Sequence, residues 1–247
     1  QLQLLVILAY NSIMKNTILD KTKLVNSVFS KVYKKYDLMN DIMSLGIHRI
    51  WKEKFIEWMN PQANSKLIDV ASGTGDIAKL FSRKNNHLSE ITCVEPNNEM
   101  FEEGKKNLKK LKNINWIKSQ AEKLPLKDNT YDYYSISYGI RNVSDINKAL
   151  KEAHRVLKPG GRFMCLEFSK IDNETLNFFY RQYSKTIPLI GKFVVGSSEP
   201  YEYLIKSIDQ FYSQNQLIKL MINNGFYNTE YRNLSNGLSA IHSGWKI

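Results

Sequence analysis

The sequence has little cysteine, little histidine and no long apolar run, and each shortage excludes a class of protein. Its two cysteines, Cys93 and Cys165, lie in apolar stretches, which indicates buried thiols in a reducing compartment and excludes a disulfide framework. The four histidines are scattered without metal-ligand spacing, so no metal site is predicted. The apolar stretch Leu2–Ala9 is far shorter than the ~20 residues that a membrane-spanning helix needs.

Length and composition favour one large α/β domain. The 247 residues are 43% hydrophobic and 24% charged, as in globular proteins. The net charge of +11 favours an anionic partner, either nucleic acid or an acidic membrane surface, unless it is only a lysine-rich solvated exterior. No basic–aromatic RNA-binding module is present, so no nucleic acid is predicted. We expect residues 1–25 to be an N-terminal extension or leader remnant and residues 26–247 to form the single domain.

One stretch organises the chain, from Leu67 to Ala78. Apolar residues at 66–70 predict a buried strand, Ser72-Gly73-Thr74-Gly75 predicts a tight turn, and a helix pattern starts at Asp76. A strand, a glycine turn and a helix N-terminus form a cradle for a polar ligand. The spacing of Gly73, Gly75 and Ala78 fits a dinucleotide, with Glu95 on a ribose. Asp69, at the end of the strand, instead favours a cationic ligand such as S-adenosylmethionine.

Strands and helices alternate through the middle of the chain, which predicts a mostly parallel sheet. The terminal segments differ: helices are expected at 26–60, including His48–Met59, and an inserted lid at 171–209. A C-terminal antiparallel hairpin is expected to turn at Asn236-Gly237. The predicted strands are 66–70, 90–95, 114–118, 132–137, 162–168, 226–234 and 238–246, and the remaining helices are 76–84, 98–110, 145–157 and 210–223.

Several longer segments are more selective than the glycine turn, and they resemble the UbiE/COQ5 methyltransferase family. They are Tyr36-Asp-Leu-Met-Asn40, Gly46-Ile-His-Arg-Ile-Trp-Lys52, Ser137-Tyr-Gly-Ile-Arg-Asn142, Arg155-Val-Leu-Lys-Pro-Gly-Gly161, Leu166-Glu-Phe-Ser169, Tyr201-Glu-Tyr-Leu204, Ser207-Ile208 and Ala240-Ile-His-Ser-Gly244. The resemblance implies a class I S-adenosylmethionine-dependent methyltransferase with a Rossmann-like sheet. It also implies C-methylation of a polyprenylated benzoquinol in ubiquinone synthesis, or of a demethylmenaquinone naphthoquinol. The ending resembles the mitochondrial ubiquinone branch, which implies the matrix face of the inner membrane, with a membrane-associated protein of the bacterial cytoplasm as the alternative.

The resemblance also implies binding residues and partners. Cofactor binding is expected at Asp69, Gly73, Thr74, Gly75, Glu95, Gln120, Ala121 and Ser137. Two of these depart from the family pattern, because Glu95 stands where Asp is usual and Gln120 where Asp or Asn is usual. His48 and Tyr201 are expected to contact the substrate. Other quinone-biosynthesis enzymes and a second copy of the chain are the expected protein partners.

Arg141 and Asn142 are the predicted catalytic residues. A ring carbon attacks a methyl group well only when the ring is a phenolate, and forming a phenolate at pH 7 costs about 4 kcal/mol for a phenol pKa near 10. One well-placed cationic donor contributes about 3–4 kcal/mol, so Arg141 is expected to stabilise the phenolate, Asn142 to orient the same oxygen, and a water to take the proton. A structural role for Arg141 in its loop is the alternative. Other open functions are an RNA or protein methyltransferase, a NAD-dependent oxidoreductase and a non-catalytic scaffold.

Overall fold

The computed structural model describes residues 23–28, 30, 36–44, 46–171 and 173–247. The predicted N-terminal extension, residues 1–25, lies outside the described residues apart from residues 23–25, which belong to a helical segment at 23–28. None of the helices in the described part of the chain combines the length and the apolar content that crossing a bilayer requires.

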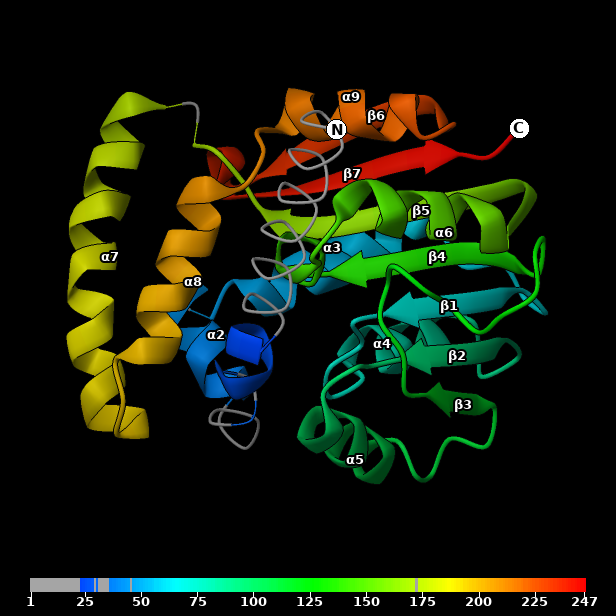
Figure 1. The fold of residues 1–247 in the computed structure, drawn as a ribbon, viewed down its shortest axis with the longest axis horizontal. Coiled ribbons are helices and arrows are strands. Elements are labelled where there is room, and N and C mark those ends of the chain that lie inside the picture. The colour runs from blue at the N-terminus through cyan, green and yellow to red at the C-terminus, as the bar shows by residue number, and fades with distance from the viewer. Residues whose placement is uncertain (1–22, 29, 31–35, 45, 172) are drawn as a thin grey trace, which may run out of the picture.

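A seven-stranded sheet forms the centre of the protein, in the order β3-β2-β1-β4-β5-β7-β6 (Figure 1). β1 lies between β2 and β4 and runs parallel to both, whereas β7 is antiparallel to β5 and β6. The predicted mostly parallel sheet with a C-terminal antiparallel hairpin is therefore confirmed. The strands are β1 (Lys66–Val70), β2 (Glu90–Val94), β3 (Ile114–Ile117), β4 (Tyr131–Ser137), β5 (Leu157–Phe168), β6 (Tyr227–Leu234) and β7 (Ser239–Trp245).

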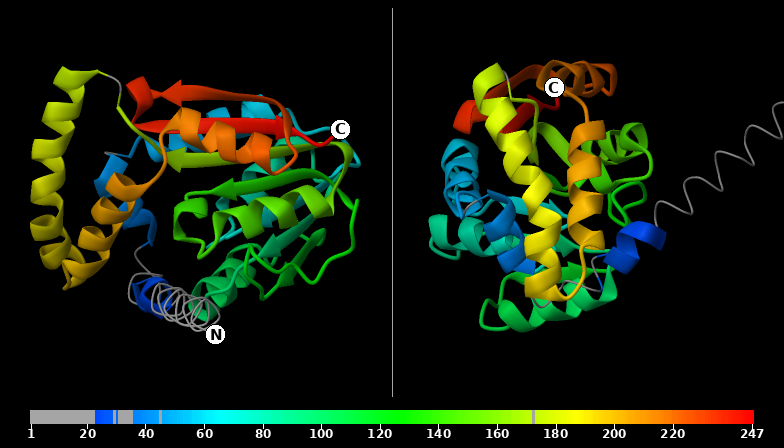
Figure 2. Two further views of the ribbon diagram at one scale, coloured as in Figure 1. Left: turned by 45° about the horizontal axis from the view of Figure 1, so that its top comes forward. Right: turned by 90° about the vertical axis from the view of Figure 1, so that its left-hand side faces the viewer.

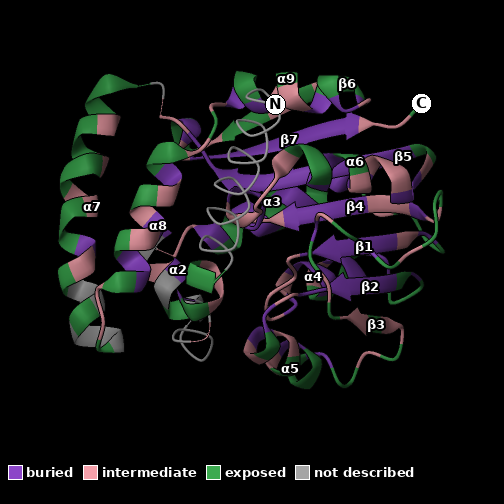
Figure 3. Cartoon of the chain, in the orientation of Figure 1, coloured by how far each residue is buried: buried purple, intermediate pink, exposed green. Residues whose placement is uncertain are grey.

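Helices cover both faces of the sheet, and each face has its own core. One core joins the sheet to α3, α4 and α8 and contains Trp51, Phe81 and Tyr201, whereas the other joins it to α6 and α9 and contains Leu150 and Met221. The inner strands β1, β2, β4, β5 and β7 are mostly buried between these layers, whereas the edge strands β3 and β6 are intermediate or exposed (Figure 3). The helices are α2 (Tyr36–Ser44), α3 (His48–Met59), α4 (Asp76–Lys84), α5 (Asn98–Asn107), α6 (Ile146–Val156), α7 (Glu174–Val195), α8 (Glu199–Gln210) and α9 (Gln214–Asn223), with 3-10 turns η2 (Ile140–Asn142) and η3 (Ser235–Gly237).

The predicted lid, residues 171–209, folds into the two helices α7 and α8. These helices lie side by side at one end of the sheet, and α7 is the more exposed of the two (Figures 2 and 3). They are joined by a short segment after Gly196, whose left-handed φ of 83° ends α7. The insertion therefore adds a helical layer at the edge of the sheet where parallel strands end.

The two largest errors in the predicted boundaries each arise from a contact that the local pattern does not contain. β5 begins at Leu157, not at residue 162, because Leu157 pairs with Tyr131 and the backbone of Gly160 and Gly161 hydrogen-bonds to Lys246. The helix predicted at 210–223 starts only at Gln214. Ser213 caps it through a reciprocal capping box with Gln216, and α8 has already ended at Gln210.

Candidate active site

The site lies where the strand order reverses, between the carboxyl ends of β1 and β4. From β1 the chain continues to β2 and β3 on one side of the sheet, whereas β4 continues to β5 on the other. Open α/β sheets bind ligands at such a reversal. Two adjacent pockets open there, which we call pocket A and pocket B, and a third, pocket C, adjoins pocket A.

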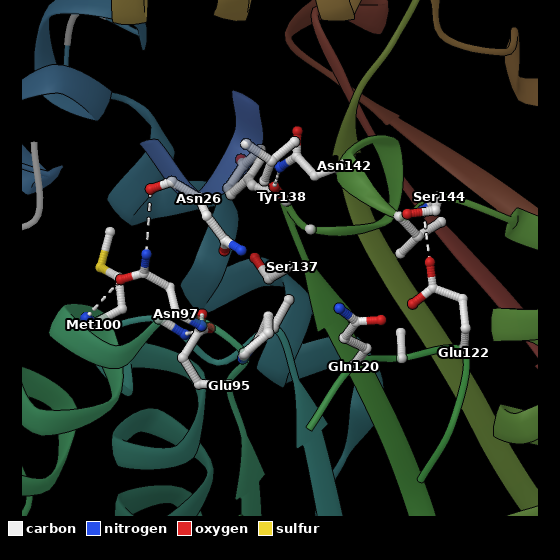
Figure 4. Close-up of a pocket in the computed structure, with 17 residues that line it drawn as sticks. Asn26, Glu95, Asn97, Met100, Gln120, Glu122, Ser137, Tyr138, Asn142 and Ser144 are labelled. Carbon is white, nitrogen blue, oxygen red and sulfur yellow. Dashed lines mark hydrogen bonds between the residues drawn. The ribbon is translucent and has the colours of Figure 1, made fainter. Parts of the chain in front are cut away.

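Pocket A lies beside the glycine turn and the end of β4. Its cavity volume is about 100 Å³, and it is partly open to solvent. Figure 4 shows Glu95 and Asn97 on one side and Gln120 on the other, with Ser137 between them. Six predicted site residues line it: Gly73, Glu95, Gln120, Ala121, Ser137 and Asn142.

Pocket B is smaller and lies beside the glycine turn. It shares Ala71, Gly73, Ser137 and Tyr138 with pocket A, so the two pockets are adjacent. The residues found only in pocket B are mostly polar or charged: Lys52, Asp69, Ser72, Thr74, Asp76 and Ile77.

Glu95 follows β2 directly and is almost fully buried, with 6% of its surface exposed. Its carboxylate accepts the backbone N–H of Gly73 and of Asn97, both at 2.9 Å. Burial raises the pKa of Glu95 to about 7, although these two hydrogen bonds oppose the rise. The glycine turn is thus tied to the acidic residue predicted to hold a ribose.

Asp69 lies in β1 and is 1% exposed. Its Oδ1 accepts the Ser135 hydroxyl at 2.7 Å, whereas its Oδ2 is buried without a partner among the described residues. Burial, together with the nearby charges of Glu95 and Asp76, raises the pKa of Asp69 to about 7, although the Ser135 hydrogen bond and the charge of Lys52 oppose the rise. An unsatisfied buried carboxylate oxygen is costly, and a cationic ligand in pocket B would satisfy it.

The turn between β1 and α4 has a strained backbone. Gly73 and Gly75 have φ of 55° and 92°, and a Cβ on Gly75 would lie 2.5 Å from a Leu108 side-chain carbon. Gly75 therefore allows close packing of the turn against the end of α5, and it lines neither pocket. Ala71 and Tyr138 also have positive φ, 52° and 55°, although they are not glycines. Such strain concentrates at functional sites, and both residues line pockets A and B.

Asn97 lies on the wall of pocket A and was not among the predicted site residues. Its Oδ1 accepts the Met100 N–H and caps α5, while its Nδ2 donates to the backbone oxygen of Asn26 (Figure 4). The same Nδ2 also donates to Ser30 Oγ. These contacts place residues 25 and 26 on the wall of pocket A. An asparagine directly before a predicted helix is an N-cap signal that would have identified it.

Arg141 and Asn142 are neighbours in η2 but face different surroundings. The Arg141 guanidinium donates to Glu167 Oε1 at 2.6 Å and to the Tyr138 backbone oxygen at 2.7 Å, and it lines pocket C rather than pocket A. The exposed fractions of the Arg141 and Glu167 side chains are only 4% and 1%. Asn142 lines pocket A, and its Oδ1 accepts the Tyr203 hydroxyl at 3.0 Å.

The structure does not bring His48 and Tyr201 to the walls of these three pockets. His48 is 2% exposed, its Nδ1 lies 3.0 Å from Ser44 Oγ, and burial followed by the charge of Lys52 lowers its pKa to about 4. Tyr201 is fully buried in the core shared by α3 and α8. The predicted substrate contacts of these two residues therefore rest on the sequence alone.

Comparison with known proteins decides the family. The sequence model of the ubiE/COQ5 methyltransferase family matches residues 16–246. The chain belongs to this family. It is 51% identical over 235 residues to a protein of Rickettsia bellii and 50% identical to one of Rickettsia prowazekii, both covering 92% of this chain and 94% of the relative. Both are named "Ubiquinone/menaquinone biosynthesis C-methyltransferase UbiE".

A solved structure supports the predicted class I methyltransferase fold. An S-adenosylmethionine-dependent methyltransferase of Thermotoga maritima, described as a possible histamine N-methyltransferase, superposes with a TM-score of 0.63. The superposed region covers 90% of this chain and 99% of the Thermotoga maritima chain, with 22% sequence identity. Similarity at this level of identity shows the fold alone. The predicted fold class and the predicted cofactor, S-adenosylmethionine, are confirmed by the family and this fold.

The similar proteins determine neither the ring type of the substrate nor the compartment of this protein. The names of the relatives include both ubiquinone and menaquinone, so they do not separate a benzoquinol from a naphthoquinol. Both relatives are bacterial proteins, so they give no support to the mitochondrial prediction and agree with the bacterial alternative.

Proposed function

We propose that this chain transfers a methyl group from S-adenosylmethionine to a ring carbon of a polyprenylated benzoquinol in ubiquinone biosynthesis. The observation that carries the proposal is the pair of buried carboxylates, Asp69 and Glu95, on either side of a glycine turn in this family's fold. Their pocket continues past Asn142 toward a largely apolar third pocket. A site of this form holds a polar cofactor beside an apolar acceptor.

The residues of pockets A and B fit S-adenosylmethionine. Glu95 would accept the ribose hydroxyls, Gln120 and Ala121 would meet the adenine edge, and Ser137 and Thr74 would line the path between nucleoside and amino acid. The unpartnered Asp69 Oδ2 would accept the ammonium group. When bound, the cofactor supplies a methyl group on a sulfonium.

Asn142 would orient the ring oxygen of the acceptor. Tyr203 donates to its Oδ1, and its Nδ2 lies 3.3 Å from the Tyr138 backbone oxygen, so the amide is held at the wall of pocket A. Holding two reactants in line supplies much of the rate in such a reaction, about 7–11 kcal/mol in favourable cases. The ring hydroxyl proton would leave to water.

Arg141 is better described as a positioning residue than as the phenolate stabiliser predicted from the sequence. Glu167 already counters its charge, and swinging the guanidinium toward pocket A would leave a buried carboxylate unpaired. Its hydrogen bond to the Tyr138 backbone fixes the loop that carries Asn142. Arg141 would therefore act on the reaction through Tyr138 and Asn142.

Pocket C offers a path for the prenyl tail. It shares Val143 and Ser144 with pocket A and lies between η2 and α8. The apolar part of its lining suits an isoprenoid chain, which has no hydrogen-bonding groups, while Arg141, Lys206 and Gln210 supply polar groups. The apolar and aromatic lining residues are Leu24, Ile140, Val143, Ile146, Tyr203, Phe211 and Tyr212. α3, from the predicted helical cover, and α8, from the predicted lid, would lie on two sides of the site.

The substrate proposal is tested by direct competition between acceptors. Short-tailed demethyl benzoquinol and demethyl naphthoquinol are supplied together with S-adenosylmethionine, and the products are separated by mass spectrometry. We expect methylation of the benzoquinol with the higher kcat/KM. Exclusive methylation of the naphthoquinol would establish the menaquinone alternative, and methylation of RNA or protein with neither quinol modified would overturn the proposed class.

The exposed face of α7 fits an anionic membrane surface. Phe178, Phe179 and Leu189 expose 58%, 64% and 64% of their surface, and the exposed Arg181 and Lys185 follow Phe178 at helical spacing. Such a face combines apolar insertion with about 1 kcal/mol of attraction per basic residue. A bacterial protein associated with the membrane in this way could receive a prenylated substrate directly, and other quinone-biosynthesis enzymes or a second copy of the chain remain predicted partners.

Replacing both phenylalanines by serine should weaken binding to vesicles that contain anionic lipid by at least about tenfold, because each buried aromatic side chain contributes about 1.5–3 kcal/mol. Flotation at low salt measures the bound fraction. The matched control replaces Leu88 and Ile222, exposed by 57% and 53%, by serine away from α7. Equal losses in both variants, or no preference for anionic lipid, would exclude α7 as the docking face.

A further inference from the structure

Lys52 is a charged residue in the buried stripe of α3. The stripe consists of His48, Trp51, Lys52, Phe55, Ile56 and Met59. The Lys52 side chain is 8% exposed, and its Nζ donates to Asp76 Oδ2 at 2.6 Å. Lysines are rarely this buried unless paired, so a specific electrostatic role is expected. The Asp76 side chain is 40% exposed. Among the described residues, it is the only hydrogen-bond partner of the Lys52 ammonium.

The walls of pockets A and B are otherwise acidic. Among their described lining residues, Lys52 is the only lysine or arginine, whereas Asp69, Asp76, Glu95 and Glu122 carry carboxyl groups. Lys52 is therefore the only cationic side chain that an anionic group would meet among the described residues lining pocket B. An ammonium group would be attracted by the unpartnered Asp69 Oδ2. The pocket therefore complements a zwitterion, with one group for each charge.

We propose that Lys52 recognises the carboxylate of the methyl donor, whose amino-acid end would lie in pocket B beside the glycine turn. The inference rests on the proposed binding of the nucleoside in pocket A. A free ammonium has three donors, and Asp76 uses one of them, so the remaining donors can serve a carboxylate without breaking the ion pair. Asp76, the first residue of α4, then holds Lys52 in place at the edge of the glycine turn.

A purely structural Lys52 predicts a different ligand dependence. If Lys52 served only to fix Asp76 and the start of α4, its removal would disturb every ligand of the two pockets alike. If Lys52 binds the carboxylate, its removal weakens the binding only of ligands that carry that carboxylate. Decarboxylated S-adenosylmethionine keeps the nucleoside, the sulfonium and the amine and lacks this single group, so it separates the two roles.

Calorimetry on the wild-type chain gives the first test, in the absence of any quinol. S-adenosylmethionine should bind roughly 10- to 100-fold more tightly than the decarboxylated analogue, the scale of a charge-assisted hydrogen bond. Equal affinities would overturn the assignment of Lys52 while leaving quinol methylation intact. Failure to bind either compound would overturn the cofactor site itself.

The Lys52→Met variant gives the second test. Its affinity for S-adenosylmethionine should fall by the same factor, while its affinity for the decarboxylated analogue stays within about twofold of wild type, which also shows that the variant is folded. Lys54→Met, on the same helix at a 56% exposed position, should change neither affinity. Should Lys52→Met fail to fold, Asp76→Asn decides the question, because it keeps the ammonium and should preserve the preference for the carboxylate. Parallel losses for both ligands in either variant would contradict the proposal.

Discussion

Replacing Arg141 by methionine should lower the free energy of unfolding by about 3–5 kcal/mol, because the substitution leaves the carboxylate of Glu167 buried and unpaired. The two side chains are 4% and 1% exposed, and their charged atoms lie 2.6 Å apart. Denaturant unfolding measures the loss. Arg83→Met provides the matched control, since Arg83 pairs with Glu53 at the surface, where such pairs contribute at most about 1 kcal/mol.

The double variant Arg141→Met with Glu167→Leu separates stability from catalysis. Removing both charges should recover most of the lost stability, because no ionised group is then buried alone. Turnover should remain about 10- to 100-fold below that of the wild type, because the Tyr138 backbone loses the hydrogen bond that fixes the Asn142 loop. Recovery of full turnover together with stability would show that Arg141 has no part in the reaction. Failure to recover stability would contradict the ion-pair explanation.

The affinity for S-adenosylmethionine should fall by roughly 10- to 100-fold between pH 8 and pH 6. Burial raises the pKa of Asp69 and Glu95 to about 7 in the free protein. A cationic ligand with ribose hydroxyls stabilises both ionised carboxylates, so binding lowers their pKa values. Affinity is then fully present above pH 7 and is lost as the pH falls through 7, by up to tenfold per pH unit for each group.

Calorimetry in two buffers of different ionisation enthalpy measures this effect as proton release on binding near pH 6.5. Glu95→Gln removes one titrating group and should roughly halve the slope of log affinity against pH, whereas Glu99→Gln, on the neighbouring α5, should leave it unchanged. Because Asp69 and Glu95 influence each other, the remaining slope belongs to the pair and is not assigned to one residue alone. A pH-independent affinity would show that neither carboxylate contacts the ligand.

The elements that the sequence predicted best are those whose boundaries depend on local contacts. The bounds of β1, α3 and α4 were predicted correctly, because apolar periodicity, the glycine turn and the asparagine-proline at 60–61 are all local signals. The start of β5 was missed, because Lys158–Gly161 is held by the backbone of Lys246 at the other end of the chain. No local pattern contains that partner.

The same distinction explains the site. Asp69 and Glu95 could be placed because they follow or end neighbouring parallel strands, whose carboxyl ends meet at one edge of the sheet. The Arg141–Glu167 pair could not be predicted, because the two residues are 26 positions apart and meet only through the register of β4 and β5. His48 lies in a motif of the family, but a motif gives a neighbourhood and not the direction of a side chain, and that of His48 points into the interior.

Transfer of a labelled methyl group tests the central claim most directly. The chain is incubated with S-adenosylmethionine carrying a trideuterated methyl group and with a short-tailed demethyl benzoquinol, and the product is examined by mass spectrometry and NMR. The account predicts one trideuteromethyl group bound to a ring carbon, and its loss or strong reduction in Asn142→Ala with cofactor affinity preserved. A label on a ring oxygen, or an unmodified quinol in the presence of bound cofactor, would contradict it.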